Sequence, residues 1–225
     1  MIFEGIVTLV IIYFSAKFVL SRKQKTQLAY IQNYKFNSAI SKKVKEKYPH
    51  LSAQDISLVL RALKDYFYIC NKAKRKMVSM PSQVVDVAWH EFILFTRQYQ
   101  QFCDKALGRF LHHTPAEAMT KPTAAQDGIK RAWRIACEKY NIHPSSPNRL
   151  PLIFEIDTKL NIPDGFKYST NCLSKSAKSA GADYCAAHIG CSSGCAGDSG
   201  GDSEGGFFDS FGGDSSGCGG GCGGD

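Results

Sequence analysis

The sequence predicts an all-α protein in three parts: a single N-terminal transmembrane helix, a compact helical domain, and a disordered tail rich in glycine and cysteine. Three observations support this fold class. Residues 2 to 20 are almost entirely apolar, later stretches repeat apolar residues at helical spacing, and 15 of the 20 glycines lie from Gly190 onward. With 225 residues the chain has room for one domain plus attachments, which excludes a large multidomain enzyme.

The first part, residues 1–21, is predicted to cross a membrane. Its apolar run contains only two charges, Glu4 and Lys17. As a helix, 19 residues span about 28 Å, close to the roughly 30 Å of bilayer hydrocarbon. A cleaved signal peptide and a buried core helix are the alternatives, but the positive charges follow the run instead of preceding it. The same charges predict an outside N-terminus and a cytoplasmic C-terminal domain.

The next part, residues 22–50, is predicted to be a basic juxtamembrane helix. Between Arg22 and Lys47 there are eight lysines and arginines, against Glu46 as the one acid. We expect Arg22, Lys23 and Lys25 to contact the headgroups of a lipid bilayer with anionic lipids. The sequence has no zinc-finger, homeodomain or RNP-like pattern, so nucleic acid is not expected as a partner.

Residues 51–170 are predicted to form the all-helical domain. Cap signals indicate helix starts at four points: Ser52, which forms a capping box with Asp55; Thr114, followed by a proline; Thr123; and Pro151. The helix after Thr123 has one apolar stripe from Ile129 to Tyr140. The helical region from about residue 25 to residue 168, about 140 residues, is enough for one hydrophobic core.

The densest chemistry lies in residues 82–115, which contain His90, Cys103, His112 and His113. Imidazole and thiolate are natural ligands for zinc and related metals, so these residues are candidate metal ligands. In one unbroken helix, His90 and Cys103 would be about 20 Å apart on roughly opposite faces. A shared metal site therefore requires a helix break, and Thr96 is the local candidate for capping a second helix.

Two other interpretations of this stretch remain open. The histidines lie among apolar residues and can be hydrogen-bonded packing residues, which is the interpretation that the pattern favours. A Cys103 nucleophile with a histidine base is the third interpretation. Asp86 lies one helical turn before His90 and can orient the His90 ring with or without a metal.

Residues 82–115 resemble the glycine-rich domain-containing protein-like family, whose pattern joins a Trp-His pair, a Tyr-x-x-x-Cys and a later histidine. The matching residues are Asp86, Trp89, His90, Leu94, Tyr99, Cys103 and His112 or His113. The family pattern has a second histidine where this chain has Phe92, so one ligand is missing. It has a proline where this chain has Thr96, which supports a helix break there. The family is largely uncharacterised, so the resemblance implies little about activity.

The last part, residues 171–225, is predicted to be a flexible Gly/Ser/Cys-rich acidic tail. Cys185, His188, Cys191 and Cys195 are candidate ligands for a metal in this tail, although their spacing matches no familiar zinc finger. The chain has a net charge of +8 and six acids beyond Cys195, so the residues up to Cys195 carry +14. We therefore expect transient contact between the tail and the body.

Together these features predict a single-pass membrane protein that presents a small helical binding or scaffold domain to the cytoplasm, for an unknown protein partner. The alternative is a membrane-anchored metal-binding protein, with zinc as the expected ion. An enzyme is the third class. The sequence lacks a nucleophile elbow, phosphate loop, HExxH motif and dinucleotide fingerprint, which argues against catalysis.

Overall fold

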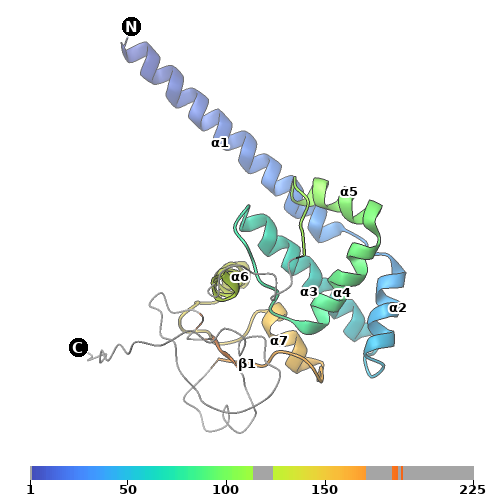
Figure 1. Cartoon of the computed structure of the whole chain (residues 1–225). Helices are drawn as coiled ribbons and strands as arrows, with labels where there is room; N and C mark the ends of the chain where they lie inside the picture. The colour runs from blue at the N-terminus through green and yellow to red at the C-terminus, as the bar shows by residue number, and fades with distance from the viewer. Residues whose placement is uncertain (1, 114–123, 171–183, 187–188, 190–225) are drawn as a thin grey trace, which may run out of the picture.

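The computed structural model describes residues 2–113, 124–170, 184–186 and 189. These residues form seven helices and two short strands, arranged as in Figure 1. The helices are α1 (Ile2–Asn33), α2 (Ser38–Lys47), α3 (Ala53–Lys72), α4 (Gln83–Leu94), α5 (Thr96–Ala106), α6 (Ala124–Tyr140) and α7 (Leu152–Lys159). The strands are β1 (Tyr168–Ser169) and β2 (Tyr184–Cys185), which pair in parallel. The predicted all-α domain is therefore confirmed as mostly helical.

Helix α1 has two unlike halves. Its C-terminal half packs on the domain through α3 and α5, where Ile31 is fully buried. Its N-terminal half projects away from the domain (Figure 1). There the large apolar side chains are exposed, from Ile6 at 55% to Leu20 at 65%.

The predicted transmembrane helix is wrong. Within the described residues, no helix is both long enough and apolar enough to span a membrane. The apolar run of α1 from Ile2 to Leu20 covers about 28 Å of helix, close to the roughly 30 Å of hydrocarbon, but it contains charged residues. Lys17 interrupts this run, and Arg22 follows it.

The predictions that depended on the membrane span fall with it. They are the single-pass membrane location, the outside N-terminus, and the presentation of the domain from a membrane to the cytoplasm. In place of one predicted basic helix over residues 22–50, residues 22 to 33 continue α1 without a break and α2 follows as a separate helix.

Helix α3 forms the centre of the domain. It packs against α1, α2, α4, α6 and α7, and its buried side chains run from Ile56 to Asn71. Phe67 of α3 meets Phe102 of α5 with ring centroids 4.6 Å apart, and Phe92 of α4 joins them. The predicted capping box is confirmed at the start of this helix, because Ser52 and Asp55 exchange side-chain to backbone hydrogen bonds.

A helix break near Thr96 is also confirmed. Helix α4 ends at Leu94, Phe95 lies between the two helices, and α5 begins at Thr96. Thr96 is the first helical residue of α5 and not its cap, and no side chain caps this end. The break turns the chain so that α4 and α5 pack on each other.

A buried carboxylate fixes the start of α4. Asp157 of α7 accepts hydrogen bonds from the Ser82 hydroxyl (2.7 Å) and from the backbone nitrogens of Gln83 (2.7 Å) and Val84 (3.2 Å). It also accepts one from the Phe166 nitrogen (3.0 Å). The first backbone N–H groups of a helix lack partners inside the helix, and Asp157 supplies them from a different element. The position of α4 is thereby tied to α7.

Some predicted features fall outside the described residues. The helix start at Thr114 is one, as is the residue Thr123 before α6. Most of the predicted tail is another, because only residues 184–186 and Ile189 are described beyond residue 170. Ala186 is fully buried in the core, so this short stretch belongs to the domain.

Candidate metal centre

Three potential metal ligands meet at one surface of the domain. Asp86 and His90 are one turn apart on α4, and His113 lies in the segment after α5. One ligand atom from each of them lies within 4.8 Å of the other two. A carboxylate and two imidazoles form a donor set that suits zinc and related transition metals.

The spacing of the three side chains fits a small ion. The His90 Nδ1 lies 3.1 Å from one carboxylate oxygen of Asp86, and the His113 Nε2 lies 3.5 Å from the other. Ligand atoms at about 2.0–2.1 Å from a tetrahedral ion are about 3.4 Å from each other. Only small movements would therefore bring these donors around one ion.

The same atoms also bind protons. The His90 Nδ1 is 2.9 Å from the backbone oxygen of Asp86 as well as close to its carboxylate. A nitrogen that faces two acceptors must carry the hydrogen, so Nδ1 is the protonated nitrogen in this arrangement. A metal at Nδ1 would replace that proton.

Asp86 is partly buried and contacts both rings. Burial raises the pKa of the Asp86 carboxyl above its ordinary value, and the neighbouring His90 and His113 act in the opposite direction. The Asp86 and His113 side chains are each 23% exposed, and that of His90 is 49% exposed. The site is therefore anchored on the domain side and open to solvent beside His90.

The segment that carries His113 is held by a chain of hydrogen bonds. The Trp89 indole donates to the Tyr99 hydroxyl (3.1 Å), and that hydroxyl donates to the Leu111 carbonyl. The His113 ring also packs on Trp89, with ring centroids 4.8 Å apart, and on His90, at 4.1 Å. These contacts place His113 over the face of α4 that carries Asp86.

The other ligands predicted in this stretch lie elsewhere. Cys103 is fully buried on α5, and burial raises the pKa of its thiol, which favours the neutral form over the metal-binding thiolate. His112 is exposed and packs on Phe110, with ring centroids 4.7 Å apart. The structure thus groups His90 with His113 and places Cys103 and His112 outside this cluster.

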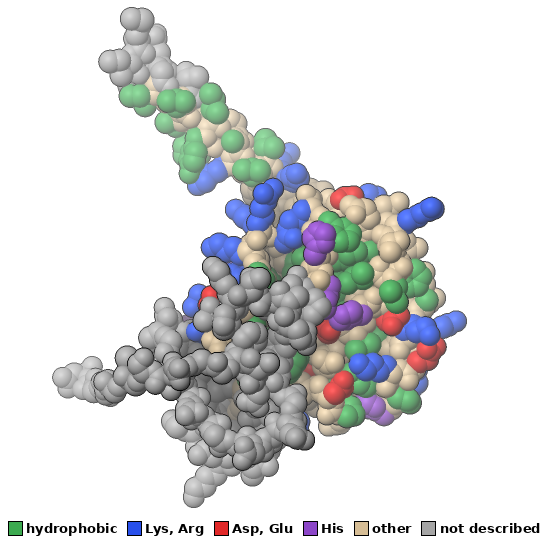
Figure 2. Space-filling view, in the orientation of Figure 1, with side chains coloured by type: hydrophobic (Ala, Val, Ile, Leu, Met, Phe, Trp, Pro, Cys, Tyr) green, Lys and Arg blue, Asp and Glu red, His purple; other side chains and the backbone are tan. Residues whose placement is uncertain are grey.

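The remaining predicted site residues stay predictions. His188, Cys191 and Cys195 lie outside the described residues, and only the backbone of Cys185 is described, in β2. Arg22, Lys23 and Lys25 are exposed on α1, and their contact with anionic headgroups stays a prediction. Figure 2 shows lysines and arginines gathered where α1 joins the domain.

Sequence reasoning found His90 and Asp86 as neighbours but assigned Asp86 only an orienting role. The signal for a ligand pair was the four-residue spacing on one helix. The approach of His113 depends on the turn at Gly108, whose φ is +68° and which the sequence predicts as the end of the second helix. The sequence does not show which of His112 and His113 faces Asp86.

Comparison with known proteins places the chain in a family. A model of the UCP032817-like family matches residues 26–189, which include all three ligands but neither the projecting half of α1 nor the residues beyond Ile189. No curated protein and no solved structure matches the chain. Because the match covers well over half of the sequence, the chain belongs to the uncharacterised UCP032817-like family.

Proposed function

We propose that this protein binds a divalent transition metal ion, with zinc as the expected ion, through Asp86, His90 and His113. The observation that carries the proposal is the convergence of three donor atoms within 4.8 Å from two separate segments of the chain. An accidental surface pair is common, but a third donor from a different element requires a defined fold.

The donor set leaves room for further ligands. Three protein ligands are one fewer than a closed tetrahedral zinc site uses, and the half-exposed His90 marks the open side. Water or a ligand from outside the site would complete the coordination. The ion would also link α4 to the segment that carries His113, so metal binding would stabilise the domain.

A histidine pair within the chain provides a matched test. His113→Ala removes one ligand, whereas His112→Ala removes the neighbouring exposed histidine outside the cluster. We expect the His112→Ala protein to bind one more equivalent of zinc than the His113→Ala protein, measured by elemental analysis after dialysis. Equal zinc contents in the two folded variants would contradict the proposal. Comparing variants of the full chain cancels any zinc that the tail cysteines hold.

Trp89 supplies a second measurement at the site itself. Its ring packs on His113, so a quenching ion such as Cu²⁺ at His113 should lower its fluorescence. The other tryptophan, Trp133, is buried on α6 and is removed by Trp133→Phe. In that background, Cu²⁺ should quench the fluorescence of the protein with His112→Ala at lower concentration than with His113→Ala.

A second candidate function is that of a binding or scaffold module for a protein partner. The specific observation in its favour is the exposed apolar half of α1, since water-facing apolar patches mark interaction sites. The narrower resemblance of residues 82–115 to the glycine-rich domain-containing protein-like family also stays a proposal.

A further inference from the structure

The projecting half of α1 is the main exposed apolar surface in the described part of the protein. Of the large apolar side chains that are exposed there, all except Met77 and Leu94 lie on α1 between Ile6 and Leu20. In Figure 2 this half carries hydrophobic side chains along its length and lysine and arginine side chains at its base. A contiguous exposed apolar surface of this kind marks an interaction site, because covering it removes apolar area from water.

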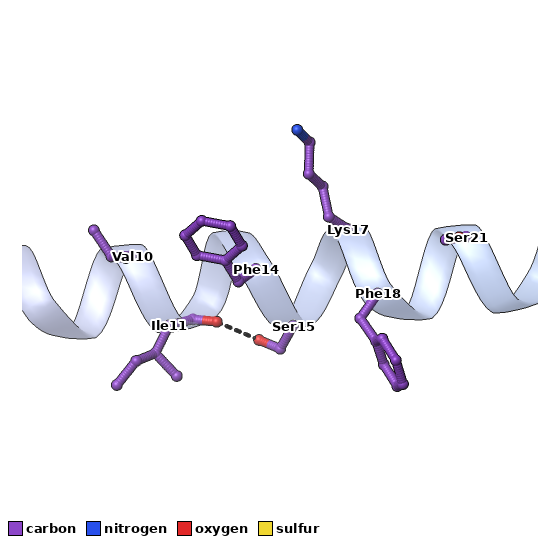
Figure 3. Close-up of a pocket in the computed structure, with 7 residues that line it drawn as sticks. All are labelled: Val10, Ile11, Phe14, Ser15, Lys17, Phe18 and Ser21. Carbon is purple, nitrogen blue, oxygen red and sulfur yellow. Dashed lines mark hydrogen bonds between the residues drawn. The ribbon is translucent and has the colours of Figure 1, made fainter.

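One face of the projecting half of α1 has a shallow pocket (Figure 3). Its lining includes Val10, Ile11, Phe14, Ser15, Lys17 and Phe18. The Ser15 hydroxyl donates a hydrogen bond to the Ile11 carbonyl of its own helix (2.6 Å). Its hydrogen therefore needs no acceptor from a group bound in the pocket. The pocket therefore offers aliphatic and aromatic contacts with the Lys17 ammonium as its cation.

The cations beside the pocket lack anionic partners among the described residues. Lys17 and Arg22 lie over the rings of Tyr13 (4.9 Å) and Phe18 (4.6 Å), and no described carboxylate lies within ion-pair distance of either. Lys23 and Lys25 are exposed next to them and are also without such a partner. An occupant with apolar groups and negative charges would match this surface.

We propose that the acidic C-terminal segment of the same chain, residues 196–225, docks on the apolar pocket of α1. This segment carries Phe207, Phe208 and Phe211 in a short run. Among and around these rings stand Glu204, Asp209 and Asp214, and the segment has no lysine or arginine. The phenylalanine rings enter the pocket, and the carboxylates pair with Lys17 and the cations at the base of α1.

The chain is long enough for this contact. From Ile189, the last described residue, to Phe207 there are 18 residues of chain, which span up to about 60 Å when extended. A domain of about 165 residues has a radius of gyration of about 15 Å and is therefore about 40 Å across. The extended chain is therefore about 20 Å longer than the domain is wide, which exceeds the roughly 12 Å of helix from Arg22, at the base of α1, to Phe14 in the pocket. Because the contact is intramolecular, a modest intrinsic affinity is enough to populate it.

The test uses the full chain with a photo-crosslinking residue, p-benzoyl-L-phenylalanine, in place of Phe14. Phe14 is 63% exposed, so the replacement leaves the core intact. The last lysine is Lys178, so trypsin releases the tail as one fragment, residues 179–225, and the label as residues 1–17. We expect light to join these two fragments within one chain, with a yield independent of protein concentration.

Two variants of the labelled chain sharpen the result. Replacing Phe207, Phe208 and Phe211 by serine should lower the yield several-fold, and high salt should lower it as well. Replacing Ser203, Ser210 and Ser215 by alanine changes three tail residues without touching the rings and should leave the yield unchanged. An unchanged yield in the phenylalanine variant would overturn the proposal.

Other occupants of the surface would give different products. A cross-link between two chains that increases with concentration would assign the surface to a second copy. A cross-link to phospholipid in phosphatidylserine vesicles, without the intramolecular product, would assign it to a lipid surface. Either result, or no product at all, overturns tail docking and leaves the metal centre untouched.

Discussion

The Trp89 indole nitrogen donates a hydrogen bond to the Tyr99 hydroxyl 3.1 Å away, across the break between α4 and α5. The Tyr99 hydroxyl in turn donates a hydrogen bond to the Leu111 carbonyl, two residues before His113. One buried phenol thus joins the helix that carries Asp86 and His90 to the segment that brings His113.

Tyr99→Phe should therefore weaken both the fold and the metal centre. The substitution leaves the buried Trp89 N–H and the Leu111 carbonyl without a partner, which costs about 1–3 kcal/mol in the free energy of unfolding. It should also loosen His113 and weaken zinc binding, measured by calorimetric titration. The exposed Tyr13→Phe is the control and should change neither quantity. Full stability of the Tyr99→Phe protein would show that this hydroxyl is not structural.

Metal affinity should fall with pH. The ion needs an ionised Asp86 and imidazoles free of the competing protons, so protons and metal compete for one set of atoms. Burial raises the pKa of the Asp86 carboxyl, so this competition begins at higher pH than for an exposed carboxyl. We expect the zinc dissociation constant to rise about tenfold or more between about pH 7.5 and about pH 5.5. Asp86→Asn should bind zinc more weakly at pH 7.5 and show a smaller dependence, whereas a constant affinity would exclude the site.

Asp157→Ala should be among the most damaging single substitutions. It removes the acceptor for the Ser82 hydroxyl and two backbone nitrogens at the start of α4, and for the Phe166 nitrogen. We expect the free energy of unfolding to fall by about 3 kcal/mol or more, measured by urea denaturation. Glu155→Ala on the same helix removes a solvent-exposed carboxylate and should change it by about 0.5 kcal/mol or less. Similar midpoints for the two variants would refute the anchoring role.

Gly128→Ala should destabilise the protein although alanine favours helices. A Cβ at this buried position would lie 2.2 Å from the Ser79 Oγ and 2.8 Å from the Ser79 backbone nitrogen. The hydroxyl can rotate away, but the backbone cannot, so we expect a loss of about 1–3 kcal/mol. Gln126→Ala, at an exposed position of α6, is the control and should be neutral. A more stable Gly128→Ala protein would mean that the segment around Ser79 yields easily.

The sequence predicts features that depend on residues close together in the chain better than contacts between residues far apart in the chain. The Ser52 and Asp55 capping box and the break before Thr96 depend on residues a few positions apart, so both could be predicted from the sequence. The contact of His113 with Asp86 joins residues 27 positions apart, and the hydrogen bond from the Gln83 nitrogen to Asp157 joins residues 74 positions apart. The packing of the whole domain determines which residues meet in these two contacts.

The membrane-spanning prediction failed for a different reason. It took the apolar run before Arg22 as sufficient by itself, and the described helices do not include one that meets the requirement for a span. The apolar half of α1 is helical as expected, yet helicity and an apolar surface are also what a docking surface needs. Sequence composition does not separate these two uses.

The hydrogen bonds between Asp157 and the first turn of α4 set a lower limit on the length of a fragment that can represent the metal centre. A peptide of residues 82–113 contains every proposed ligand, but it ends long before the acid that orients its first turn. Such a peptide would hold Asp86 and His90 on an unanchored helix, and its metal affinity would understate that of the whole protein. A faithful minimal fragment has to extend at least through Phe166, where the same carboxylate is bound from the other side.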